Sequence, residues 1–228
     1  GSSDTRAPAV VMWLIVWMLF RTMFGAGMIK IHGDPCWRDL TCMVYHYETQ
    51  PLPNPVSWHC HHLPVFIHKA GVLFNHFVEL VVPWFLFAPA PLRHVAAGLI
   101  ILFQLMLIIT GNFSWLNHIT IVLAIACFDD VFLSQFLTVE RAVPDQLPAG
   151  QLVVVTVLAV FVAARSVRPA RNLFSRRQLM NASFDPLHLV NTYGAFGSIT
   201  RERFEIIIKG TNDEHHGDSA AWREYEFK

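Results

Sequence analysis

The sequence KIHGDPCWRDLTCMVYHYETQPLPNPVSWHCHHLPVFIH, residues 30–68, is a polar connection around which the other segments are organised. It lies between apolar segments and contains most of the cysteines and half of the histidines of the chain. Its prolines prevent one long helix from running through it. A long, structured, polar connection is a common place for function, because a loop that merely links two helices is usually shorter.

The composition indicates a membrane protein. The chain is 54% apolar and 15% charged, whereas about 25% of the residues of a soluble domain are charged. The 18 phenylalanines agree with rings that face lipid or lie at its interfaces. The formal net charge is zero and no basic face is evident, so the sequence gives no support for nucleic acid as a partner. We therefore expect the lipid bilayer to be the first partner of this chain.

Apolar segments on both sides of the polar connection predict an all-α polytopic membrane helix bundle of four or five spans. The segments are Ala9–Ile29, Leu63–Leu86, Leu92–Thr110, Ser114–Phe128 and Gln151–Ala164. The last segment is short for a span. It either crosses by recruiting the flanking loop or lies in the membrane interface.

A few ionisable residues interrupt these segments. Arg21 is the only charge in the first segment, and it either snorkels to the surface or pairs with a carboxylate such as Glu79 or Asp129. His76 and Glu79 are three residues apart, a spacing that carboxylate-bridged metal sites use. Because the next span supplies no further carboxylate, we interpret them as a buried polar pair and expect no metal.

The chain divides into residues 1–166, the helix bundle with its polar connection, and residues 167–228, a basic segment and the start of a β-rich soluble domain. Arg203–Lys209 and Trp222–Phe227 have the pattern of strands and are expected to pair as a hairpin. Two strands are not stable alone, so the sheet should continue beyond the last residue. The chain also starts without a methionine. We expect an internal piece of a longer protein.

A cluster of arginines follows the last apolar segment. Its members are Arg165, Arg168, Arg171, Arg176 and Arg177. Basic residues beside the end of a span favour the cytosolic side of the membrane. By itself the cluster therefore predicts that residues 165–177 face the cytosol.

Several long motifs carry a family resemblance. They are GAGMIKIHGDPCWRDLTCMVYHYETQP (25–51), PNPVSWHCHHLP (53–64), FNHFVELVVPWFLF (74–87), ITGNFSWLN (109–117), ACFDD (126–130) and NTYGAFGSITRERFEI (191–206). In these motifs the chain resembles the lipase maturation factor family. Its ACFDD motif is more similar to that of the family member that acts on lipases than to that of the paralogous member.

The resemblance implies a multi-pass protein of the endoplasmic-reticulum membrane. Its implied role is chaperone-like, in the folding and dimer assembly of secreted lipases such as lipoprotein lipase, which would be its client partners. It also implies a luminal C-terminal domain, in conflict with the orientation that the arginines favour. The membrane core is distantly similar to that of vitamin K-dependent carboxylase. The alternative function is therefore a membrane-embedded enzyme with HYETQP lining its cavity.

The cysteines give one expected crosslink. Cys36 and Cys42 are close enough in sequence for one turn of chain to bridge them, and the lumen that the resemblance implies is oxidising. We therefore predict a disulfide between them. No zinc-like spacing of cysteines is present, and the histidines of the HxHH motif (59–62) are interpreted as interfacial rather than as metal ligands.

The candidate functional motif lies within the polar connection. Its residues are Asp34, Trp37, Arg38, Asp39, His46, Tyr47, Glu48 and Gln50. Within it, Arg38, Asp39 and Glu48 are predicted to form a partly buried charge network. If the protein is an enzyme, the candidate bases are His46, Glu48 and Lys30. The sequence has no nucleophile elbow, phosphate-binding loop or complete triad, so we expect no cofactor and favour a non-enzymatic role.

Overall fold

The structure is a computed structural model that describes residues 8–137, 148–212 and 220–225. Among these residues, four helical segments are long and apolar enough to cross a membrane. They are α1 (Ala9–His32), Val65–Phe87, α6 (Ala90–Thr110) and α9 (Ala149–Leu173). The shorter apolar helix α7 (Leu116–Ile125) and the four-residue α8 (Asp130–Leu133) follow α6. The predicted helical membrane bundle is confirmed.

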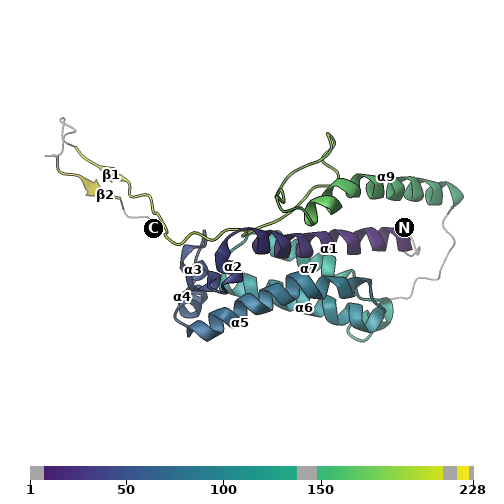
Figure 1. Ribbon diagram of the computed structural model, residues 1–228, viewed down its shortest axis with the longest axis horizontal. Helices are drawn as coiled ribbons and strands as arrows, with labels where there is room; N and C mark the ends of the chain where they lie inside the picture. The colour runs from purple at the N-terminus through teal and green to yellow at the C-terminus, as the bar shows by residue number, and fades with distance from the viewer. Residues whose placement is uncertain (1–7, 138–147, 213–219, 226–228) are drawn as a thin grey trace.

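Helix α1 is the central element of the bundle, with α9 on one side and α5 (Val65–His76), α6 and α7 on the other (Figure 1). Apolar side chains lie on nearly all of its faces, and it packs against α9, α7 and the second half of the second span. Its Leu19 packs in a core with Val78, Leu86, Ala97 and Ile100, all of which are fully buried. This core ties the first three spans together.

The second span is not a continuous α-helix. It begins as α5 (Val65–His76), continues as the π-helix η1 (Phe77–Val81) and ends as the 3-10 helix η2 (Val82–Phe87). Pro83, which has no backbone N–H, lies at the start of the tighter helix. A π-helix shifts the side chains that follow it around the axis and is often found at functional sites. Here it contains the buried Glu79.

The polar connection folds into three short helices, as its prolines predict. These are α2 (Pro35–Arg38), α3 (Cys42–Thr49) and α4 (Pro55–His61). Asp34 caps α2, because its Oδ1 accepts a hydrogen bond from the N–H of Cys36 at 2.9 Å. Asn54 and Ser57 form a capping box at the start of α4. The three helices pack together at one end of the bundle (Figure 1).

Helix α9 is longer than the apolar segment Gln151–Ala164 that marks it in the sequence. It runs without a break across residue 166, carries three arginines in its second half and includes Pro169. Trp17 Nε1 donates a hydrogen bond to Ser166 Oγ at 3.0 Å, and Leu173 packs against the α1 core. These contacts align α9 with α1. Its length is that of a spanning helix rather than of a short interfacial segment.

The chain after α9 is irregular and lies along α1. Gln178 Nε2 donates to the carbonyl of Gly25, and Asp34 N donates to the carbonyl of Gly197. The predicted hairpin is confirmed, but it is smaller than expected: β1 (Lys209–Gly210) pairs antiparallel with β2 (Arg223–Glu224). The end of the second predicted strand, residues 226–228, lies outside the described residues.

The expected pairing of Arg21 with Glu79 or Asp129 is wrong. Its Nη1 donates to the backbone carbonyl of Asn191 at 2.9 Å, and its guanidinium lies 5.7 Å from the centre of the Trp17 ring. The two proposed carboxylate partners are engaged elsewhere, Glu79 by Lys30 and Asp129 by a histidine. Backbone carbonyls and aromatic faces are the remaining ways to stabilise a guanidinium at membrane depth.

Candidate functional site

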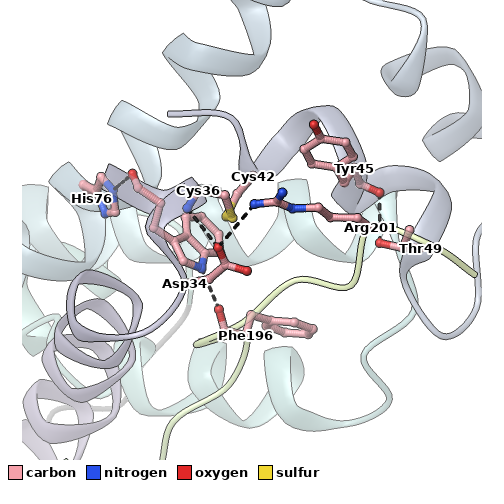
Figure 2. The surroundings of a disulfide bond; sticks show 9 residues. Asp34, Cys36, Cys42, Tyr45, Thr49, His76, Phe196 and Arg201 are labelled. Carbon is pink, nitrogen blue, oxygen red and sulfur yellow. Dashed lines mark hydrogen bonds and ion pairs between the residues drawn. A yellow bond between two sulfur atoms is a disulfide. The ribbon is translucent and has the colours of Figure 1, made fainter. Parts of the chain in front are cut away.

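A disulfide joins Cys36 and Cys42, the pair that the sequence singles out, with Cα atoms 4.8 Å apart. Both cysteines are buried, and they pack with Trp37, Met43 and Val72 in a small second core. Figure 2 shows the disulfide at the point where α2, α3 and the C-terminal segment meet. The crosslink closes a tight loop and fixes the direction in which α3 leaves α2.

The C-terminal segment is attached to this second core by hydrogen bonds. Trp37 Nε1 donates to the carbonyl of Phe196 at 2.8 Å. Arg201 lies 4.0 Å from the carboxylate of Asp34, with its guanidinium 5.6 Å from the centre of the Tyr45 ring (Figure 2). We call this contact region, residues 34–50 with residues 193–203, the junction. It connects the membrane bundle to the hairpin region.

A buried ion pair lies beneath the junction. Lys30 Nζ contacts the two carboxylate oxygens of Glu79 at 2.6 and 2.8 Å and Asn75 Oδ1 at 2.8 Å. Asn75 Nδ2 also donates to Glu79 at 3.0 Å. Lys30 and Glu79 are each 4% exposed. An ammonium group has three donors and no acceptor, so Lys30 is fully paired and has no lone pair with which to act as a base.

The predicted pair of His76 and Glu79 is therefore not formed. Nε2 of His76 contacts the carbonyl of Trp37 at 3.0 Å, while Glu79 pairs with Lys30. Among the described residues no group of His, Cys, Asp or Glu is arranged to hold a metal ion.

A cavity of about 60 Å³ lies next to the ion pair, and several polar side chains interrupt its mostly apolar wall. These include Lys30, His46, Glu79, Gln104, Asn117 and Tyr193. The imidazole of His46 is 6% exposed and lies among the rings of Tyr47, Phe113 and Phe196. Burial and the nearby Lys30 charge lower the pKa of His46 to about 4. His46 is therefore neutral at physiological pH.

Other predicted motif residues lie on the surface. Arg38, Asp39 and Glu48 are all exposed, so the predicted buried charge network is wrong. Glu48 instead lies 3.4 Å from His61, in a surface pair. Helix α2 turns Cys36 and Trp37 inward, and its next residues therefore face solvent.

Tyr47 and Gln50, two further motif residues, are half-buried and buried. Tyr47 is half-buried against His68, and burial raises the pKa of its hydroxyl. Gln50 is buried, and its Nε2 donates to the carbonyls of Tyr47 and Thr110 at 3.2 and 3.0 Å. It ties the end of α3 to the end of α6.

The sequence reasoning missed three side chains of this site. Asn75, Gln104 and Asn117 are polar residues within apolar segments, and each lines the cavity. Their position within apolar segments could have identified them, because a polar side chain inside a membrane span usually faces the bundle interior. The sequence does not show how the helices are aligned with one another, and this alignment brings the three side chains to one cavity.

Comparison with known proteins gives a consistent picture. The family profile described as Lipase maturation factor transmembrane domain matches residues 1–135, and the one described as Lipase maturation factor C-terminal domain matches residues 189–228. Lipase maturation factor 1 of Mus musculus is 47% identical over 246 residues, which cover 99% of this chain and 43% of the mouse protein.

Two further relatives extend the comparison. Lipase maturation factor 1 of Homo sapiens is 45% identical over 98% of this chain and 43% of its own length. Lipase maturation factor 2 of Homo sapiens is 45% identical over 54% of this chain and 18% of its own length. The chain thus spans less than half the length of these relatives. No solved structure matches it.

Proposed function

The chain belongs to the lipase maturation factor family, and from that premise we propose that it is part of a chaperone-like factor of the endoplasmic-reticulum membrane. Its clients would be secreted lipases, which it would help to fold and to assemble as dimers. The observation that carries the proposal is the identity of 45–48% to lipase maturation factor 1 over nearly the whole chain.

The junction gives this role a physical basis. Residues 193–203 are attached to a disulfide-crosslinked core on the membrane bundle through Trp37 and Asp34. A soluble domain that follows these residues would therefore be held close to one membrane surface. Glu48 is the exposed acid of the HYETQP motif, and its surface pair with His61 leaves it accessible to a client there.

The disulfide supports a luminal position for the junction. Disulfides persist in oxidising compartments, and Cys36–Cys42 lies at the end of the bundle from which the C-terminal segment leaves. The arginines of α9 do not require the opposite orientation. Arg168 donates to the carbonyl of Phe184 at 3.2 Å, and the Arg165 guanidinium lies 5.2 Å from the centre of the Phe161 ring. They take part in packing within the protein.

A chimera tests the proposed role. This chain would replace the region that it matches in mouse lipase maturation factor 1, in cells that lack the endogenous protein. We expect the chimera to restore secreted lipase activity, while the mouse protein with this region deleted should not. A chimera that reaches normal abundance in the membrane without restoring lipase secretion would refute the proposal.

A membrane-embedded enzyme is the second candidate, and the cavity beside the ion pair favours it. Of the three candidate bases, Lys30 is fully paired and Glu48 lies on the surface, which leaves His46, whose side chain lines the cavity. In the chimera, His46→Gln separates the two functions. Loss of lipase secretion at unchanged abundance would favour catalysis, and unchanged secretion would favour the scaffold.

A further inference from the structure

One polar side chain of the cavity wall lacks a hydrogen-bond partner among the described residues. Nδ2 of Asn117 is buried without one, and the side chain of His46, which is 6% exposed, lines the same cavity. Gln104 Nε2 reaches only the weakly accepting sulfur of Met23, at 3.6 Å. Leaving a buried donor unpaired costs about 1–3 kcal/mol, and native proteins seldom tolerate it without a bound group. These side chains point to a partner that is not part of the chain.

The charges around the cavity specify the kind of partner. Lys30 and Glu79 neutralise each other at 2.6 Å, and His46 is neutral. An anion or a cation entering the cavity would find no free opposite charge, and burying an unpaired charge is costly. An uncharged group that both donates and accepts hydrogen bonds, such as a hydroxyl beside an ester carbonyl, fits the unpaired atoms.

A larger groove adjoins the cavity. Its volume is about 550 Å³, and it lies between α1, α7 and the irregular residues 181–193. The two volumes share Thr22, Leu116, Thr120 and Tyr193 as lining residues, so a single layer of side chains separates them. A volume of this size is within the range of about 300–1,000 Å³ that is usual for ligand sites.

The groove faces the bilayer. Met18 and Ile119 line it and are 40% and 46% exposed, and Leu123 adds apolar surface. Residues 181–193 reach the middle of α1, where Asn191 contacts Arg21. Irregular backbone at such a depth is tolerated where it is buried in protein or lines a cavity. The groove is therefore open toward lipid and lies one layer of side chains away from the interior cavity.

We propose that the cavity and the groove form one site for an uncharged single-chain lipid with hydroxyl and ester groups. The polar head would bind at His46 and Asn117, and the hydrocarbon chain would lie in the groove against Met18, Ile119 and Leu123. Arg21 is held by the carbonyl of Asn191 on the groove wall and is not the anchor of the head. This site is independent of whether the protein assists lipases.

Photolabelling tests the proposal directly. The purified protein in nanodiscs of uncharged phospholipid would be labelled with a monoacylglycerol that carries a diazirine on its chain. We expect saturable labelling of α1 and α7, displaced better by unlabelled monoacylglycerol than by the fatty acid of the same chain length. Labelling that increases linearly with probe, or falls mainly on α9, would overturn the proposal. Stronger displacement by the fatty acid would also overturn it, by making Arg21 the anchor.

A pair of neighbouring variants adds a chemical test. Asn117→Leu removes the unpaired donor with little change in size and should weaken the binding of monoacylglycerol roughly 3- to 10-fold, the value of one hydrogen bond. His118→Leu changes the next residue, which is exposed, and should leave binding unchanged. Equal binding by both variants would refute the assigned head position. If Asn117→Leu does not fold, the positions labelled in the unaltered protein decide between the outcomes.

Discussion

Replacing Lys30 with methionine should destabilise the bundle strongly. The substitution keeps a long apolar stem but removes the ammonium group that lies 2.6 Å from Glu79. Glu79, 4% exposed, would then be left with only Asn75 as a hydrogen-bond partner in this cluster. Removing one member of a buried ion pair costs on the order of 3–5 kcal/mol, because the remaining charge is uncompensated. For a chain of this size that is a loss of roughly 6–20 °C in Tm.

The partner residue provides the control. Glu79→Gln alone should also destabilise, because it leaves the Lys30 ammonium without its charge partner. The double variant Lys30→Met/Glu79→Gln removes both charges and should be more stable than the sum of the single effects predicts. Thermal unfolding in detergent, followed by size-exclusion chromatography of the heated samples, measures all three variants. Additive effects would show that the two side chains do not act as a pair.

Three further predictions concern the junction. Cys36→Ser/Cys42→Ser should lower the free energy of unfolding by about 2 kcal/mol, the value for so short a loop, and an unchanged unfolding midpoint would contradict this. Trp37→Phe removes the N–H that binds the C-terminal segment and should speed proteolysis of that segment, whereas Trp13→Phe, at an exposed site, should not. Because the pKa of His46 is lowered from 6.5 to about 4, the unfolded state binds a proton that the folded state rejects. The free energy of unfolding should therefore fall by up to roughly 3 kcal/mol as the pH is lowered from 6.5 to about 4. Urea titrations over this pH range should show a weaker pH dependence for His46→Gln than for the unaltered protein.

The membrane spans could be predicted from the sequence, because the length of an apolar segment determines whether it can cross the bilayer. Ala9–Ile29 and Leu92–Thr110 lie within α1 and α6, whose bounds exceed them by only a few residues. The end of α9 could not be found in this way. Its last turns contain arginines and Pro169, which composition assigns to a surface segment. Contacts with α1, such as Trp17 to Ser166, keep the helix intact there.

The polar residues were harder to place, because their partners depend on tertiary register. Sequence spacing suggested His76 for Glu79, but the π-helix and the crossing of α1 present Lys30 instead, 49 residues away in the chain. Arg38 and Glu48 were expected to be partly buried, but the presence of a charge in a motif does not reveal which face of a short helix turns inward. The disulfide was predictable because the two cysteines are close in the chain and the compartment that the resemblance implies is oxidising.

The polar groups inside the bundle fall into two classes, and the distinction bears on function. Lys30, Asn75 and Glu79 satisfy one another, so they give the fold a fixed register without needing any further molecule. His46 and Asn117 are equally buried, line the cavity and take no part in that cluster, and Nδ2 of Asn117 has no hydrogen-bond partner among the described residues. A scaffold alone would require only the first class. The second class, gathered on one cavity that adjoins a lipid-facing groove, is what a binding site requires, and it is the reason to search for a lipid ligand even if client binding lies elsewhere.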